Sequence, residues 1–248
     1  MRRKHRTLAI LLAALLSLVC FSAYARLSFE AGTGAVFSGH NDVRAPNISG
    51  TNISLSDELE TDPDYFVRAR LAYSTGRHNI ELLAAPLRLE ASGSVNRLVK
   101  FEEEEFSANV PLTSIYKFDS YRLTYRYKVI NTRRLQAGVG ITANLKDGLI
   151  SFEGAGSESE KKDTDFTPLI NFRIRWVLSR KLSFLIEGDT LPASQERIED
   201  VLFTIQYELG NNIALKLGYR MFEGSTDVKE LYNFRVLNYA VIGPILTF

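Results

Sequence analysis

Strict alternation of apolar and polar residues is the feature that most constrains how this chain folds. In the segment 135–146 the odd positions are apolar, as at Leu135, Val139 and Ile141, and the even positions are Gln, Gly, Thr, Asn or Lys. The segment 121–129 has the same period, with Tyr, Leu and Val alternating with Arg, Thr and Lys. A period of two places successive side chains on opposite faces of a β-strand. The sequence therefore predicts strands with one apolar and one polar face.

The alternation recurs from Arg26 onward and divides the chain into ten segments. The phase of the apolar residues changes at Pro86 within the third segment, which predicts a β-bulge there. Eight strands are an alternative, since 182–189 is short, and the connection that follows the third segment has room for an extra hairpin. The segments are 27–37, 65–75, 80–91, 121–129, 135–146, 166–177, 182–189, 200–209, 213–222 and 232–248.

The connections between these segments alternate between short and long. Short turns are expected near 76–79, 131–133, 179–181 and 210–212, and longer polar connections lie between them. Outer-membrane barrels have short periplasmic turns, longer outer loops and an even number of strands. The pattern predicts an all-β fold, a closed antiparallel up-and-down transmembrane β-barrel that occupies residues 26–248 as one domain.

Alternation alone does not say which face of the sheet points into the barrel. A soluble periplasmic barrel that binds an apolar ligand, as lipocalins do, turns its apolar face inward, whereas a membrane barrel turns it outward. Amphipathic rings collect at the membrane interface, so aromatic residues at one height favour the membrane barrel. Four aromatic residues lie on the apolar parity just before short turns and form an expected girdle: Tyr73, Tyr127, Trp176 and Tyr207.

In this orientation the charged parity faces the lumen, where acidic and basic side chains are expected to pair. Since basic residues outnumber acidic ones, a narrow anion-preferring pore is an alternative to a salt-bridged core that does not conduct. The luminal charges assigned in this way are Arg68, Arg70, Arg122, Arg126, Arg173, Arg175, Arg220, Glu81, Glu187 and Glu208.

The chain ends on Phe248, inside the last alternating segment and on the same parity as Leu246 and Ile242. In this it resembles the Gram-negative outer-membrane β-barrel proteins, within the class of small barrels such as OmpA, OmpW and Opa. The resemblance implies that Phe248 belongs to the insertion signal read by the barrel-assembly machinery. It also implies contact with outer-membrane lipids and lipopolysaccharide. Pro244 departs from the usual last strand, because it cannot donate a ladder hydrogen bond.

The first 25 residues have the parts of a secretory signal peptide. A basic start at 2–6 and an apolar run at 8–20 are followed by Ala-Tyr-Ala at 23–25. We therefore expect cleavage between Ala25 and Arg26, and export through the inner membrane to the outer membrane. An uncleaved anchor is the alternative, because the apolar run just reaches the length of a spanning helix.

Composition excludes several classes of site. Cys20 is the single cysteine and lies in the expected signal peptide, so the mature chain has no disulfide, thiolate nucleophile or cysteine-ligated metal. Removing the leader takes away four of the 30 basic residues and none of the 29 acidic ones. The mature chain therefore has a slightly negative net charge, which gives no basis for nucleic-acid binding. No cofactor is expected, and the oligomeric state is left open.

The sequence gives no clear catalytic site. His78 falls in a short turn and is expected to be solvated, whereas His40 precedes Asp42 by two residues and offers a conceivable rim dyad. A lipid-modifying enzyme of the outer membrane is therefore an alternative. The outer loops, including the acidic run Glu102–Glu105 and the linker-like stretch 154–160, are the places for any binding function. We expect an integral outer-membrane barrel with a structural or surface-interaction role and no catalysis.

Overall fold

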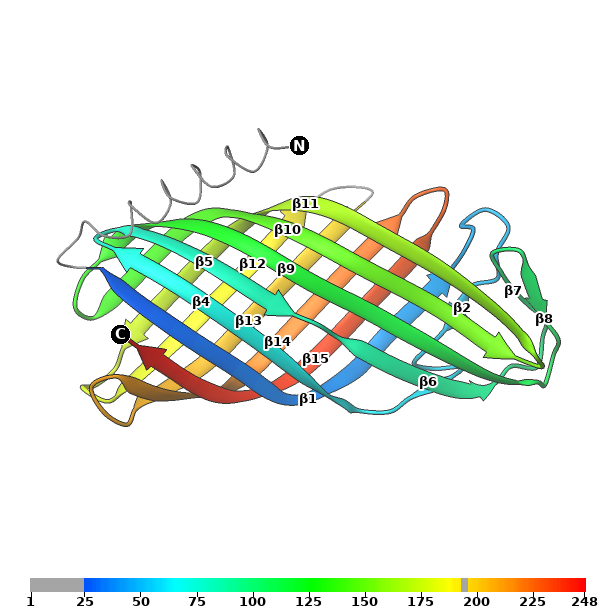
Figure 1. The fold of residues 1–248 in the computed structure, drawn as a ribbon, viewed down its shortest axis with the longest axis horizontal. Coiled ribbons are helices and arrows are strands. Elements are labelled where there is room, and N and C mark those ends of the chain that lie inside the picture. Colours follow the sequence, from blue (N-terminus) through cyan, green and yellow to red (C-terminus); the bar gives the residue numbers. More distant parts are fainter. Residues whose placement is uncertain (1–24, 193–195) are drawn as a thin grey trace, which may run out of the picture.

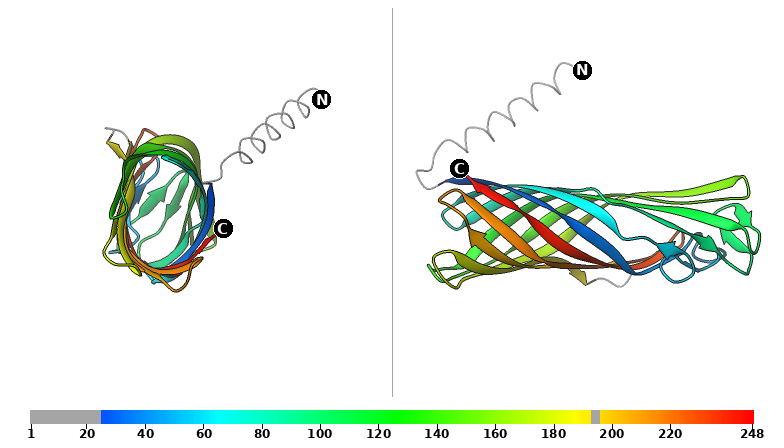
Figure 2. Two further views of the ribbon diagram at one scale, coloured as in Figure 1. Left: turned by 90° about the vertical axis from the view of Figure 1, so that its left-hand side faces the viewer. Right: turned by 90° about the horizontal axis from the view of Figure 1, so that it is seen from below.

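The computed structural model describes residues 25–192 and 196–248 and forms one closed antiparallel β-barrel (Figures 1 and 2). Among the described residues the wall has ten strand positions, each paired with the next in sequence, and β15 pairs with β1 to close the cylinder. The wall consists of β1 (Arg26–Arg44), β4 (Asp64–Thr75), β5 (His78–Ala85) continued by β6 (Arg88–Ser94), β9 (Pro111–Asn131), β10 (Leu135–Gly154), β11 (Ser157–Val177), β12 (Leu182–Pro192), β13 (Glu196–Glu208), β14 (Ile213–Asp227) and β15 (Tyr232–Thr247).

The predicted all-β barrel is confirmed, with ten wall strands in the described part of the chain rather than eight. The short turns and the C-terminus lie at one end, here called the turn end, and the long connections lie at the other, the loop end (Figure 1). None of the described residues forms a helix long and apolar enough to span a membrane. The expected signal peptide, apart from Ala25, lies outside the described residues.

Strands extend further into the loop end than the sequence indicated. β9, β10 and β11 project beyond the other strands of the barrel wall (Figure 2, right), and β10 pairs with β11 as far as Gly154 and Ser157. Ala155 and Gly156 have φ values of 52° and 85°, the left-handed pair of a two-residue hairpin turn. The linker-like stretch 154–160 therefore forms the tip of a long hairpin and the start of β11.

Four short strands lie in two of the loop-end connections, between β1 and β4 and between β6 and β9. β2 (Ile53–Ser54) pairs with β1, and β3 (Glu60–Thr61) pairs with β6. β7 (Val99–Phe101) and β8 (Glu104–Phe106) form a separate hairpin. The extra hairpin considered from the sequence is thus present, but it lies outside the barrel wall.

The bulge predicted at Pro86 is wrong. The pair Ala85 and Ser120 is followed by the pair Arg88 and Lys117, so the register against β9 continues without a shift. Glu81, Leu87 and Leu89 all point inward, whereas Arg88 is exposed on the outside rather than in the lumen. What changes at Pro86 is the environment of each face, because beyond it the inside becomes apolar and the outside polar.

The apolar parity points outward over the turn-end half of the barrel. Leu123, Val139 and Ile141 are 50%, 54% and 68% exposed, whereas Arg122, on the other parity, is 4% exposed. A closed sheet leaves no unpaired backbone edge, and an outward apolar belt suits contact with hydrocarbon. The orientation is that of a membrane barrel and not of a soluble barrel with an apolar interior.

Aromatic side chains line this belt near the short turns. Tyr127, Trp176 and Tyr207 are exposed on the outside, and Tyr73, at the same end, is half-buried. His78 belongs to this band, since its Nδ1 lies 2.8 Å from the hydroxyl of Tyr125. It is therefore a member of an aromatic girdle and not a freely solvated turn residue.

The last residues of the chain close the ladder. The backbone N–H of Phe248 donates to the carbonyl of Leu27 over 2.8 Å, while the Phe248 side chain is exposed. Pro244 is paired with Leu215 of β14. On its other side, the pairing between β15 and β1 is interrupted at this position. A proline is tolerated here because the missing donor falls at that interruption.

Ile141→Arg tests the outward belt. Ile141 lies near the middle of the belt on β10, where an arginine facing lipid costs about 2–4 kcal/mol. Glu153→Arg is the matched control, since it lies on the same strand and parity but beyond the belt. We expect the control to change the free energy of unfolding, measured by urea titration in lipid vesicles, by no more than about 0.5 kcal/mol. Equal effects for the two variants would contradict the assignment of the belt.

Candidate functional site: the barrel interior

The interior of the barrel changes character along its axis, as β4 illustrates. From the turn end, Ser74 lines an open cavity, Arg70 and Arg68 lie among ion pairs, and Phe66 enters an apolar core. Because alternate residues of every strand face inward, each region is built by neighbouring strands at the same height.

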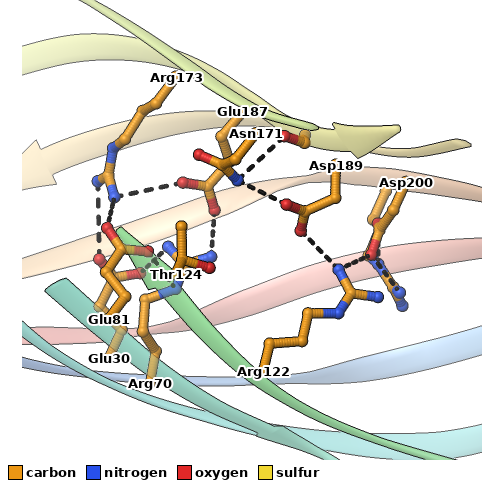
Figure 3. Close-up of polar contacts among 12 residues, drawn as sticks. Glu30, Arg70, Glu81, Arg122, Thr124, Asn171, Arg173, Glu187, Asp189 and Asp200 are labelled. Atoms are coloured by element: carbon orange, nitrogen blue, oxygen red, sulfur yellow. Dashed lines mark hydrogen bonds and ion pairs between the residues drawn. The ribbon is translucent and has the colours of Figure 1, made fainter. Parts of the chain in front are cut away.

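Three carboxylates form the centre of the lower charged layer: Glu30 from β1, Glu81 from β5 and Glu187 from β12 (Figure 3). Arg70 Nη1 lies 3.3 Å from Glu30 Oε2, Arg70 Nε lies 3.6 Å from Glu81 Oε2, and Arg70 also pairs with Glu187. Arg173 Nη1 lies 3.2 Å from Glu81 Oε1 and 3.3 Å from Glu187 Oε2. Each guanidinium thus bridges carboxylates from different strands across the lumen.

Two further cations complete the lower charged layer. Arg126 Nη1 lies 2.6 Å from Glu81 Oε1, and Lys216 Nζ lies 3.1 Å from Glu30 Oε2. Arg126 Nε also donates to Asn171 Oδ1 over 2.6 Å. Each of the three carboxylates is therefore paired with at least two basic side chains, as burial of charge requires.

The upper charged layer surrounds two aspartates. Arg122 Nη1 lies 2.7 Å from both Asp189 Oδ2 and Asp200 Oδ2. Arg220 holds Asp200 with two donors, Nε at 2.6 Å and Nη2 at 2.9 Å. Asp189 also accepts hydrogen bonds from Thr142 and Asn171 over 2.6 and 2.7 Å. Such bidentate, charge-assisted contacts fix the side chains in one arrangement.

Arg68 lies beside this layer without an ion pair among the described residues. With Arg122 and Arg220 it makes three cations against two carboxylates. The positive charges of the upper charged layer therefore outnumber its carboxylates by one.

Above the upper charged layer the interior is apolar. Arg220 lies 4.3 Å from the ring centre of Tyr239, and that ring meets Phe66 edge-on at 5.0 Å. Phe118 and Phe222 follow, with ring centres 5.3 Å apart. The core continues to the loop end through the fully buried side chains Phe101, Phe106, Phe152, Ile53, Leu55, Leu59, Leu89, Leu112, Ile198 and Leu237.

Little free space remains in the charged layers or at their border with the core. The cavity among Arg70, Glu81 and Asp189 holds about 20 Å³, and that between Phe118 and Tyr239 about 10 Å³, the room of about one water molecule each. Neither of these two cavities has room for a hydrated ion.

The larger interior space is a cavity of about 430 Å³ at the turn end, here called the turn-end cavity. Its wall includes Arg175, whose Nη2 lies 3.2 Å from Glu208 Oε1. Lys128 and Gln206 also line it, and the lower charged layer forms its blind end through Glu30, Arg126 and Arg173.

His40 and Asp42 pair on the outside of β1 near the loop end. His40 Nε2 lies 3.0 Å from Asp42 Oδ2, and its Nδ1 lies 4.0 Å from Asp57 Oδ2. The imidazole packs against Phe234 with ring centres 5.3 Å apart. The residues of the rim dyad considered from the sequence therefore do meet, with His40 held between two carboxylates.

The ten charged residues assigned to the lumen from the sequence lie on the inside of the barrel. Sequence reasoning missed Glu30 and Asp200, which hold the two charged layers together. Glu30 does follow the alternation of β1, between the exposed Phe29 and the half-buried Ala31. Asp200 was overlooked because it stands at the first position of its expected segment.

No protein family model matches the chain, and no curated protein matches its sequence. Among solved structures, the outer-membrane protease OmpT from Escherichia coli superposes with a TM-score of 0.60 at 8% identity, over 92% of this chain and 99% of OmpT. The fold is that of a Gram-negative outer-membrane β-barrel. Ail of Yersinia pestis (TM-score 0.38, 9% identity, covering 90% of this chain and 99% of Ail) and the P. putida toluene transporter TodX (0.37, 9%, 94% and 92%) are also similar.

Arg122→Met and Arg68→Met make a matched test of the charged layers. Removing Arg122 leaves two buried aspartates short of a donor and is expected to cost about 3–5 kcal/mol of unfolding free energy. Removing Arg68 deprives no carboxylate of an ion pair, so we expect less than about 1 kcal/mol. Urea unfolding in vesicles measures both, and comparable losses would contradict the pairing described.

Proposed function

We propose that the protein is an integral outer-membrane barrel that does not conduct solutes and that presents a rigid platform at the cell surface. The turn end faces the periplasm, and the loop end projects outward. The observation that carries this proposal is the filled interior, in which two ion-paired layers are followed by an apolar core. An open anion-preferring pore would need a continuous polar path instead.

The loop end suits a surface-interaction role because it has a core of its own. Phe101 and Phe152 pack with ring centres 4.7 Å apart, so the projecting β10–β11 hairpin is fixed against β7. The outer stretch 147–165 carries six acidic and two basic residues. In the neighbouring β7–β8 hairpin, Glu103 to Glu105 are exposed. Such a surface favours cationic partners, or divalent cations that bridge to lipopolysaccharide phosphates.

The proposal includes no catalytic role. OmpT is a protease, but the likeness to it is one of fold, and a fold hosts many functions. A hydrolytic dyad needs a nucleophile or a positioned water beside its base. Among the described residues the His40 ring contacts Asp42, Asp57 and Phe234, and none of these three carries a hydroxyl or thiol.

Planar-bilayer recording tests the closed lumen. The purified protein is expected to give no stable unitary current steps, because both charged layers and the apolar core obstruct the path. A general porin inserted into the same membranes serves as the positive control. Reproducible unitary steps whose size changes in Arg122→Met would overturn the proposal, since the current would then pass through the lumen.

The outer loops are also tied together by an ion pair whose strength depends on pH. Arg97 Nη2 donates to Glu58 Oε1 over 2.9 Å and to the Asn52 carbonyl over 2.8 Å. The hydrogen bonds from Arg97 lower the pKa of Glu58 below its ordinary value. A carboxyl with a lowered folded-state pKa stabilises the fold above its unfolded-state pKa, and this stabilisation is lost as the pH falls through the folded-state value.

Hydrogen exchange at residues 52–58 should therefore speed up in acid, after correction for the intrinsic pH dependence of exchange. The variant Glu58→Gln should exchange faster at neutral pH and lose this additional acid sensitivity. The effect is small, because both side chains are partly exposed and solvent screens the pair. An unchanged acid response in Glu58→Gln would show that another group controls the loop.

A further inference from the structure

The turn-end cavity differs from the rest of the interior in the balance of its charges. Its wall carries six basic side chains and two acidic ones. Both acids already have partners, since Glu30 is bound by the lower charged layer and Glu208 by Arg175. Arg26, Lys128 and Arg180 form no ion pair within the described part of the chain. The cavity therefore presents cationic groups that no protein carboxylate neutralises.

A residue of the same cavity wall carries a buried donor without a partner. Gln206 is 4% exposed and lines the cavity, yet its Nε2 has no hydrogen-bond partner among the described residues. The amide is held in position, because Ser183 Oγ donates to Gln206 Oε1 over 3.5 Å and accepts from Arg175 Nε over 3.2 Å. A buried donor without an acceptor costs free energy that a bound acceptor would recover.

We propose that the turn-end cavity is a binding site for a phosphate-bearing ligand that enters from the periplasmic side. Guanidinium groups bind phosphate oxygens through paired donors, an ammonium adds a point charge, and a side-chain amide supplies a neutral donor. A volume of about 430 Å³ is within the usual range of small-molecule pockets. The lower charged layer closes the inner end, so the cavity is a blind binding site and not the mouth of a pore.

The phosphate group bound in the cavity could come from two sources in the periplasm. One is a small soluble phosphate ester, and the other is the headgroup of an inner-leaflet phospholipid. Both present the same group to Lys128, Arg175 and Gln206. Pyrophosphate is a suitable soluble probe, and phosphatidylglycerol in the surrounding bilayer is a suitable lipid probe.

Calorimetric titration with pyrophosphate, using the purified barrel in phosphatidylcholine nanodiscs, tests the proposal. Saturable binding is expected, and Lys128→Gln should raise the dissociation constant about ten-fold, because one charge-assisted contact is lost. Arg133→Gln is the matched control. It removes one positive charge from an exposed turn at the same end but outside the cavity, and it should leave the affinity close to that of the unmodified protein.

A second titration in nanodiscs that contain phosphatidylglycerol separates the two sources. Weaker pyrophosphate binding there, in the unmodified protein but not in Lys128→Gln, supports the headgroup as occupant, whereas unchanged binding supports a soluble ester. Heat-modifiable gel migration verifies that each variant is folded. Absence of saturable binding by the folded protein, or equal weakening by Lys128→Gln and Arg133→Gln, would overturn the proposal.

Discussion

Closure of the backbone ladder is the constraint on which the structure depends. A bilayer core offers no water to unpaired N–H and C=O groups, so a sheet that crosses it must have no free edge. The pairing of β15 with β1, which ends at the contact between Phe248 and Leu27, meets this requirement. Once the sheet is closed, period-two alternation sends one set of side chains to lipid and the other into a narrow cylinder. Charges in that cylinder must then find partners within the protein.

The interior therefore differs between the two halves of the barrel. Where the outside meets lipid, the inside is polar and is held by multivalent pairs such as those around Glu81 and Asp200. Where the wall leaves the belt, beyond Pro86, the inside becomes an apolar core like that of a soluble protein. Along β5 and β6 the inner face thus changes from polar to apolar without a change in backbone register against β9. The projecting parts of β9 and β10 pack against this second core.

Much of this could be read from the sequence, and the omissions have physical reasons. The alternation at 121–129 and 135–146 predicted the barrel because lipid and lumen impose opposite demands on neighbouring residues. The change at Pro86 was misread as a bulge. Apolar side chains mark the face that is in an apolar environment, and beyond Pro86 that face is the inner one. The strand itself continues in the same register. Glu30 went unnoticed because its neighbours on the inner parity, Ser28 and Gly32, are small. Which cation meets which carboxylate depends on strand pairing across the closed cylinder, which alternation does not specify.

The most direct test of this account is a nitroxide scan along β9 in vesicles, comparing the accessibility of each label to oxygen and to a soluble nickel complex. Odd positions from 121 to 129 should be accessible to oxygen and not to nickel, odd positions from 113 to 119 should be accessible to nickel, and even positions from 112 to 126 should be protected from both. Nickel access at positions 122, 124 and 126 would instead show a water-filled lumen and contradict the closed interior.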